Sequence, residues 1–198
     1  MFALVCALEG MATTLVDDFC DPYPGHSPDS DVLDQHRRAG VRIVARDITS
    51  GTGLERGSCD AVTCFEVLEH LHGGVKMLVE EMVDALRPGG LLVISGPNAV
   101  NARKRVAVAL GRSNWSTFDS WYIDGNFRSH VREPVVKDFR RIARRVPLTN
   151  VRIVGRNWLA YVRTHNRYQV AGIRAMDHLL RRRPQLCSTI YLVANKVW

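Results

Sequence analysis

The chain has 198 residues, of which 46% are hydrophobic and 24% charged, enough for one globular domain with a buried core. This composition excludes a disordered or collagen-like chain, and no apolar run reaches the roughly 18 residues that span a bilayer. The net charge of +7 is unevenly divided, because residues 1–100 hold 7 basic and 15 acidic side chains, whereas residues 101–198 hold 20 and 5. We therefore expect the two halves to have different electrostatic roles.

Hydrophobic patterning in the first fifty residues predicts alternating helices and strands. The predicted elements are the end of a helix over 2–8, a strand over 13–17, a short helix over 31–39 and a strand over 41–45. An aspartate stands at the end of each predicted strand, Asp17 after the first and Asp47 after the second.

A strand, a helix and a second strand are predicted in the centre of the chain. Residues 59–65 form an apolar, β-rich run, and apolar residues then recur at helical spacing from Val75 to Leu86. The segment 87–90, Arg-Pro-Gly-Gly, is predicted to end this helix in a turn, since proline cannot continue a helix. A second apolar strand follows over 91–95. Strands that are apolar on both faces indicate a parallel sheet covered by helices.

The alternation of helices and strands continues to the C-terminus. The predicted elements are a helix over 135–146, a strand over 151–154, a helix over 170–180 and a last strand over 189–193. This order predicts an α/β fold of the doubly wound kind, with a mostly parallel, Rossmann-like sheet and helices on both faces.

Polar residues at the strand ends are the first candidates for ligand binding, because ligands of such folds bind beyond the carboxyl ends of the strands. Asp17, Asp47 and Glu66 follow three of the predicted strands, and residues 95–98 follow the fourth. An ionised carboxylate accepts hydrogen bonds from the hydroxyl and amino groups of a nucleoside. Taken singly, each acid is also compatible with an ordinary loop position.

Two linked motifs carry a resemblance to a known family. Residues 66–70 are E-V-L-E-H, and residues 86–90 are L-R-P-G-G. Together they resemble the class I S-adenosylmethionine-dependent methyltransferases, in the branch that has both motifs at this separation. The resemblance covers the chain from Phe2 to about Val154, and His130-Val131-Arg132-Glu133 resembles the segment that opens the family's late helix. It implies S-adenosylmethionine as the cofactor and an antiparallel C-terminal strand.

The resemblance also implies two groups of cofactor-binding residues. After the first two strands, Asp17 or the neighbouring Asp18 would bind the ribose hydroxyls, and Asp47 with Ile48 would bind the adenine. At the end of the third strand, the residues beside the methionine part would be Cys64, Phe65 and Glu66. Packing roles for Cys64 and Phe65, and an exposed helical turn for Glu69-His70, are the alternative interpretations.

One part of the family pattern is absent from this sequence. Family members place a strand and a glycine-rich acidic loop before the first helix, where backbone N–H groups accommodate the cofactor. Here the helical end over 2–8 runs through Glu9-Gly10 into the strand at 13–17, which leaves no room for them. The missing strand would be central, so its loss would leave two unpaired strand edges. The sequence therefore predicts a shortened methyltransferase domain.

Few catalytic side chains are required for methyl transfer, since the sulfonium of the cofactor is already an activated leaving group. His70 and His130 are the candidate bases, because imidazole titrates near neutral pH, although packing roles are an alternative for each. No metal site is predicted, because His70 and His72 are the only close pair of metal-ligand type. A dinucleotide oxidoreductase is excluded by the lack of G-x-G-x-x-G.

The basic C-terminal half of the chain indicates how the acceptor, the molecule that receives the methyl group, would be bound. Within one domain over 1–198, we expect a cofactor half over 1–100, a segment over 101–130 that covers the acceptor, and the last helices and strands over 131–198. The covering segment contains Arg103-Lys104-Arg105, which would attract an anionic acceptor, and aromatic residues that would line its site. These aromatic residues are Trp115, Phe118, Trp121, Tyr122 and Phe127. Arg140, Arg141, Arg144 and Arg145 are interpreted as a solvated helix face.

The leading hypothesis is S-adenosylmethionine-dependent methylation, at oxygen, of a small or a glycan- or lipid-linked acceptor. The alternative is a degenerate or truncated methyltransferase-like binding module or subunit without activity of its own. A nucleic-acid partner is disfavoured because no recognised nucleic-acid-binding module is present, and attachment of residues 168–183 to an anionic membrane surface is a third interpretation. Five scattered cysteines, an odd number, indicate reduced thiols and a cytoplasmic location.

Overall fold

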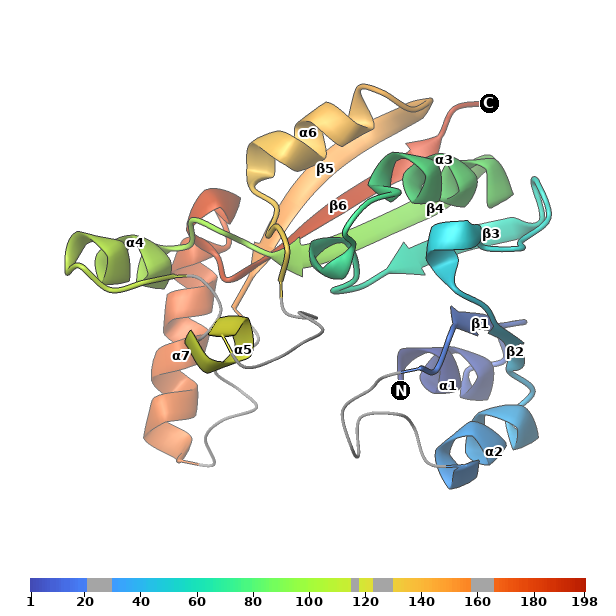
Figure 1. Ribbon diagram of the computed structural model, residues 1–198, viewed down its shortest axis with the longest axis horizontal. Helices are drawn as coiled ribbons and strands as arrows, with labels where there is room; N and C mark the ends of the chain where they lie inside the picture. The colour runs from blue at the N-terminus through green and yellow to red at the C-terminus, as the bar shows by residue number, and fades with distance from the viewer. Residues whose placement is uncertain (21–29, 115–117, 123–129, 158–165) are drawn as a thin grey trace. The chain divides into compact units, whose positions relative to one another are not determined.

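The computed structural model describes residues 1–20, 30–114, 118–122, 130–157 and 166–198 (Figure 1). Two compact units divide the chain between them. Unit 1 comprises Met1–Leu54 with Lys76–Glu81, and unit 2 comprises Glu55–Val75 with Met82–Trp198. The elements are helices and mixed β-sheets, so the predicted α/β fold is confirmed.

Unit 1 is built on a two-stranded parallel sheet. Its elements are α1 (Phe2–Leu8), β1 (Thr14–Asp17), α2 (Ser30–Arg38), β2 (Arg42–Ala45) and the short 3-10 helix η1 (Ile48–Ser50). β1 and β2 pair in parallel with Asp17 opposite Ala45, and the amide of Arg46 donates to the Asp17 carbonyl at 2.9 Å. This register places Asp17 and Asp47 at the same end of the sheet, as the sequence predicts.

Unit 2 contains a four-stranded sheet in the order β3-β4-β6-β5. Its strands are β3 (Cys59–Cys64), β4 (Leu86–Pro97), β5 (Leu148–Arg156) and β6 (Thr189–Lys196). β3 and β4 are parallel, whereas β6 is antiparallel to both of its neighbours, β4 and β5. The antiparallel C-terminal strand implied by the family resemblance is therefore present.

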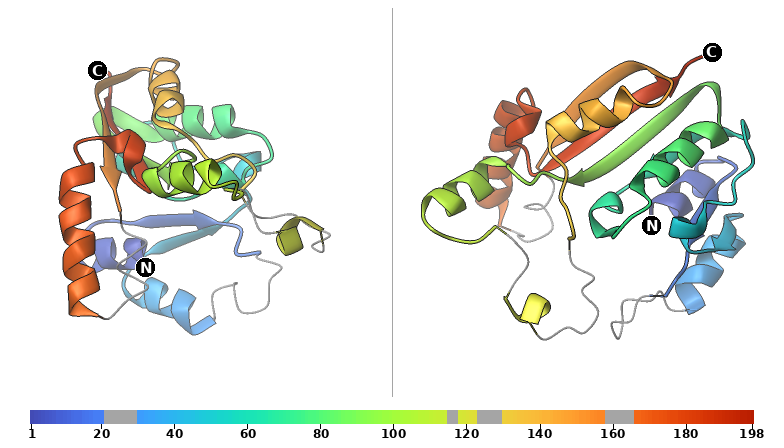
Figure 2. Two further views of the ribbon diagram at one scale, coloured as in Figure 1. Left: turned by 90° about the vertical axis from the view of Figure 1, so that its left-hand side faces the viewer. Right: turned by 45° about the horizontal axis from the view of Figure 1, so that its top comes forward.

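The remaining helices lie between these strands in the sequence. The remaining elements are η2 (Leu68–His70), α3 (Val75–Ala85), α4 (Ala102–Ala109), α5 (Phe118–Tyr122), α6 (Val136–Ala143), α7 (Arg167–Leu180) and η3 (Pro184–Leu186). α6 lies along β5 and β6 and buries Val136, Phe139 and Ala143 (Figure 2). Its arginines and the two that follow are exposed, which confirms the solvated basic face.

The turn predicted over residues 87–90 is wrong. α3 ends at Ala85 and β4 begins at Leu86, so Arg87, Pro88, Gly89 and Gly90 belong to the strand. The pairing with β3 shifts register between Cys59 and Ala61, and Gly89 has a φ of +76°. A bulge of this kind accommodates extra residues in a strand, and it tolerates a proline that cannot donate to the ladder.

The strands form two sheets, and each sheet ends in an unpaired edge. In the described part of the chain, β1 pairs with β2 alone and β3 with β4 alone. The missing central strand and glycine-rich loop stay predictions. Among the described residues, no helix has both the length and the apolar character needed to cross a lipid bilayer.

Asn98 fixes the position in which the chain leaves β4. Its side chain is fully buried, and its amide nitrogen Nδ2 donates to the carbonyls of Gln185 at 3.0 Å and Cys187 at 2.9 Å. Its backbone amide donates to the Ser188 carbonyl at 2.8 Å. One side chain thus joins the carboxyl end of β4 to the segment that precedes β6.

We predict that Asn98→Ala lowers the free energy of unfolding by about 1–3 kcal/mol, because the carbonyls of Gln185 and of the buried Cys187 lose their donor. Urea unfolding followed by circular dichroism measures this change. The matched control is Gln185→Ala, which removes an exposed amide side chain but keeps the carbonyl that accepts the bond. Equal stability of the Asn98→Ala variant and the control would contradict the role of Asn98.

Candidate functional site

The carboxylates at the strand ends of unit 1 are exposed. Asp17 accepts a hydrogen bond from the backbone amide of Phe19 at 2.8 Å, and Asp18 accepts one from the amide of Cys20 at 3.0 Å. Each of these bonds uses one carboxylate oxygen, Oδ1. The other oxygen can accept hydrogen bonds from ligand hydroxyl groups.

Asp47 begins the 3-10 helix η1 and is held by the residue two positions later. Its Oδ1 accepts from both the amide and the hydroxyl of Thr49, at 2.8 and 2.7 Å. These hydrogen bonds hold the pKa of the Asp47 carboxyl below its ordinary value, so the group is ionised near neutral pH. Ile48, the next residue, is half-buried.

In unit 2, β3 ends at Cys64, whose side chain is buried. Burial, together with the smaller effect of the nearby Glu69 carboxylate, raises the pKa of the Cys64 thiol to about 12, so the thiol stays protonated. A protonated, buried thiol is a packing residue and not a nucleophile. Phe65 is half-buried and makes an edge-to-face contact with Tyr191 of β6, with ring centroids 6.4 Å apart.

Glu66 has an unusual backbone conformation at the same strand end. Its φ is +55°, in the left-handed region that non-glycine residues seldom adopt. Its Oε1 accepts a hydrogen bond from the hydroxyl of Ser95 in β4 at 2.8 Å. Strain of this kind is concentrated at functional sites, and here it turns the chain sharply from β3 into η2.

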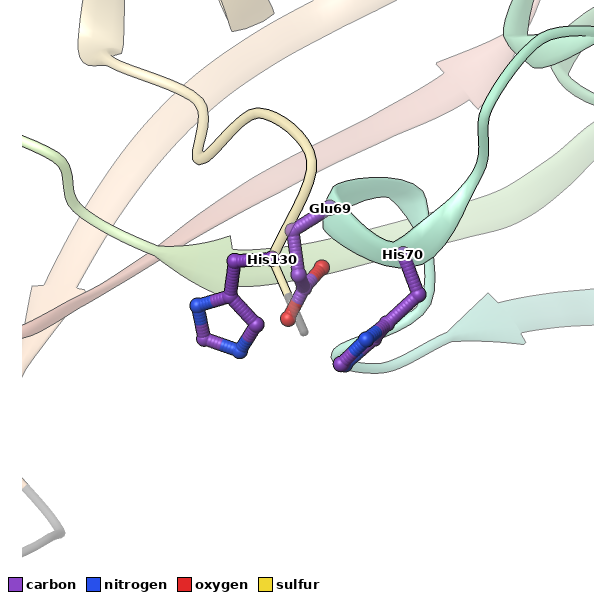
Figure 3. A group of neighbouring side chains, drawn as sticks. All are labelled: Glu69, His70 and His130. Carbon is purple, nitrogen blue, oxygen red and sulfur yellow. The ribbon is translucent and has the colours of Figure 1, made fainter. Parts of the chain in front are cut away.

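The Glu69 cluster, which we define as Glu69, His70 and His130, lies after β3 and before α6. Glu69 is completely buried, and neither oxygen of its carboxylate has a hydrogen-bond partner among the described residues. Figure 3 shows this carboxylate pointing between the two imidazole rings. The rings have centroids 4.9 Å apart in an edge-to-face arrangement. Burial raises the pKa of the Glu69 carboxyl to about 7.

Backbone hydrogen bonds bring the two parts of this cluster together. The carbonyl of Glu69 accepts from the amides of Val131 at 2.7 Å and Arg132 at 3.3 Å. Gly96 makes room for this approach, since a Cβ at Gly96 would lie only 2.8 Å from Cγ of Pro134. The segment that leads into α6 is therefore held against η2 and β4, and this places His130 next to His70.

His130 is oriented by the half-buried acid Glu133. Its Nδ1 bonds Oε1 of Glu133 at 2.8 Å, and Oε2 of Glu133 pairs with the ammonium group of Lys104 in α4. The hydrogen bond to Glu133 raises the pKa of His130 above its ordinary value. Burial alone would favour the neutral acid of Glu133, but the hydrogen bonds from His130 and Lys104 hold its pKa below its ordinary value.

The sequence identifies some members of this site and misses others. The candidate bases His70 and His130 lie together, but an exposed turn at Glu69-His70 is wrong for Glu69, which is buried. Lys104 is an ion-pair partner of Glu133 and not a free basic residue facing an acceptor. Glu133 follows His130 by three residues, and this spacing is the one feature of the sequence that could have predicted their hydrogen bond. Trp115, Phe127 and the side chain of Trp121 lie outside the described residues.

Part of the chain, including Glu69 and His70, matches a known protein family. Residues 10–94 match a family described as methyltransferase domain. No curated protein matches the chain.

Solved structures share the fold at low sequence identity. A SAM-dependent methyltransferase from Archaeoglobus fulgidus has a TM-score of 0.59 at 16% identity, over 98% of this chain and 80% of the other. A possible histamine N-methyltransferase from Thermotoga maritima has a TM-score of 0.57 at 10% identity, over 96% and 75%. Phosphoethanolamine N-methyltransferase 2 from Haemonchus contortus, in complex with S-adenosyl-L-methionine, has a TM-score of 0.56 at 14% identity, over 98% and 45%.

We predict that Lys104→Met destabilises the protein by about 3 kcal/mol, because it leaves the half-buried Glu133 carboxylate without its cation. The matched control is Lys76→Met, which breaks the Lys76–Glu80 pair on the exposed side of α3. That pair is worth less than about 1 kcal/mol, since its side chains are solvated. Chemical unfolding of both variants measures the difference, and equal losses of stability would show that the Lys104–Glu133 pair has no special role.

Proposed function

We propose that the chain, an S-adenosylmethionine-dependent methyltransferase by its family match and its fold, methylates a hydroxyl oxygen and removes the hydroxyl proton with the Glu69 cluster. The observation that carries this proposal is the pair of imidazoles of His70 and His130 at the strand ends, with His130 held by Glu133. A relative of the same fold, from Haemonchus contortus, is a complex with S-adenosyl-L-methionine.

The strand-end acids fit the nucleoside part of the cofactor. Asp17, or Asp18 beside it, has an exposed carboxylate oxygen for the ribose hydroxyls. Asp47 is held ionised by Thr49 and, together with Ile48, would bind the adenine. In unit 2, Cys64, Phe65 and Glu66 would bind the methionine part, where the protonated thiol of Cys64 supplies an apolar surface.

When bound, S-adenosylmethionine supplies a methyl group on a sulfonium, and the departing thioether needs no proton. The remaining task of the protein is to orient the acceptor and to take its proton. We propose the imidazoles of His70 and His130 as the groups that take this proton, and the hydrogen bond to Glu133 stabilises the protonated form of His130. A hydroxyl needs this assistance because it is a weak nucleophile until its proton is removed.

The charge of the chain supports an anionic acceptor. Residues 101–198 carry 20 basic side chains against 5 acidic ones. Arg103 and Arg105 are exposed on α4, which also carries the buried Lys104. We propose that the acceptor is negatively charged and is a small molecule or is linked to a glycan or lipid. The positive charge of residues 101–198 would raise the concentration of such an acceptor near the protein. All five cysteines are free thiols in the structure, which supports a cytoplasmic location.

Calorimetry with S-adenosylhomocysteine, the demethylated cofactor, tests the proposal on this chain and on a version that begins upstream of Met1. Asp17→Asn and Asp47→Asn should each weaken binding about tenfold, since hydrogen bonds to a charged group contribute about 1.5–3 kcal/mol. The control is Asp34→Asn, which breaks an exposed ion pair with Arg37 on α2 and should leave binding unchanged. A folded chain that fails to bind in both versions would contradict the proposal and favour a binding module without activity.

A further inference from the structure

The carboxylate of Glu69 is buried in a way that calls for a positively charged partner. An ionised carboxylate without hydrogen bonds or a cation is costly to remove from water, so such groups are paired or bind metals. Glu69 is 0% exposed, and its two oxygens have no hydrogen-bond partner in the described part of the chain. Its neighbours Glu66 and Glu133 are acids and make the local field more negative.

The side chains around this carboxylate are of the metal-binding type. One ligand atom from each of Glu69, His70 and His130 lies within 4.8 Å of the corresponding atoms of the other two. Ligands about 2.1 Å from one ion lie at most about 4.2 Å from each other, so small side-chain rotations bring these atoms into coordination. In Figure 3 the carboxylate and both rings converge on one side of η2.

The hydrogen bond of His130 prepares it for this role. Nδ1 of His130 bonds Glu133, so Nε2 is the nitrogen that can face an ion. Metal-bound histidines commonly have a carboxylate on the other ring nitrogen, which fixes the ring and increases its basicity. Lys104 holds Glu133 in place from α4 and balances its charge. A histidine that merely packed near a helix would not need this acid and lysine behind it.

We propose that Glu69, His70 and His130 bind a divalent transition-metal ion. One carboxylate with two imidazoles suits Zn²⁺, Mn²⁺ or Fe²⁺, and it leaves coordination positions open for water or another oxygen ligand. The role of the ion rests on the proposed function. With the ion bound, the two imidazoles act as its ligands and do not take the proton themselves; an acceptor hydroxyl bound at an open position would instead lose its proton to water more readily, because a cation lowers the pKa of a bound O–H group.

The site is tested by metal binding alone, without methyl transfer. The full chain, freed of metal by a chelator that is then removed, is titrated with Mn²⁺, and the free ion is measured by electron paramagnetic resonance. Mn²⁺ is the first probe because it favours oxygen and nitrogen ligands over the thiolates of the five cysteines. Zn²⁺ is then tested by calorimetry. We expect one ion per chain.

Three variants identify the ligands. Glu69→Gln and His70→Gln should each weaken Mn²⁺ binding at least tenfold. His70 is exposed, so its variant remains informative even if the change at buried Glu69 impairs folding. The control His72→Gln removes an exposed imidazole two residues from His70 and should leave affinity unchanged. No binding by the folded wild-type chain, or equal affinity of His70→Gln and wild type, would overturn the proposal.

Measuring S-adenosylhomocysteine binding on the same metal-free sample separates the two proposals. Intact cofactor binding without metal binding would overturn the metal site and leave the methyltransferase proposal standing. Metal binding without cofactor binding would keep the site but remove its role in methyl transfer.

Discussion

The burial of the Glu69 carboxylate is the constraint on which the functional end of unit 2 depends. Removing a carboxylate from water costs several kcal/mol unless another group compensates it. The same residue is fixed by its backbone carbonyl, which holds the segment at 131–132 and so brings His130 beside His70. A single position in the E-V-L-E-H segment therefore sets both the chemistry and the geometry of the site.

The charged groups around Glu69 form a connected series of ion pairs and hydrogen bonds. Lys104 neutralises Glu133, Glu133 orients His130, and His130 faces the Glu69 carboxylate. The network ties α4, the segment before α6 and η2 to one another, although they are distant in the sequence. Such an arrangement would hold these side chains in place before a ligand arrives, which is what the proposed methyl transfer requires of them.

Much of the fold could be predicted from the sequence, because apolar periodicity fixes the strands and helices. The antiparallel last strand and the strand-end aspartates Asp17 and Asp47 followed from pattern and resemblance. The bulge over 87–90 did not, since Pro-Gly-Gly is equally typical of a turn. The burial of Glu69 and the pairing of Lys104 with Glu133 also escaped prediction, because they depend on contacts between segments 29 or more residues apart.

We propose that Glu69, His70 and His130 act together as one metal-binding centre. Its most direct test is anomalous diffraction from a crystal of the full chain grown with Zn²⁺ and S-adenosylhomocysteine. We expect an anomalous peak about 2.0–2.2 Å from the Glu69 carboxylate and from one nitrogen of each imidazole. A peak on other side chains only, or a Glu69 carboxylate that turns away from both rings, would contradict it.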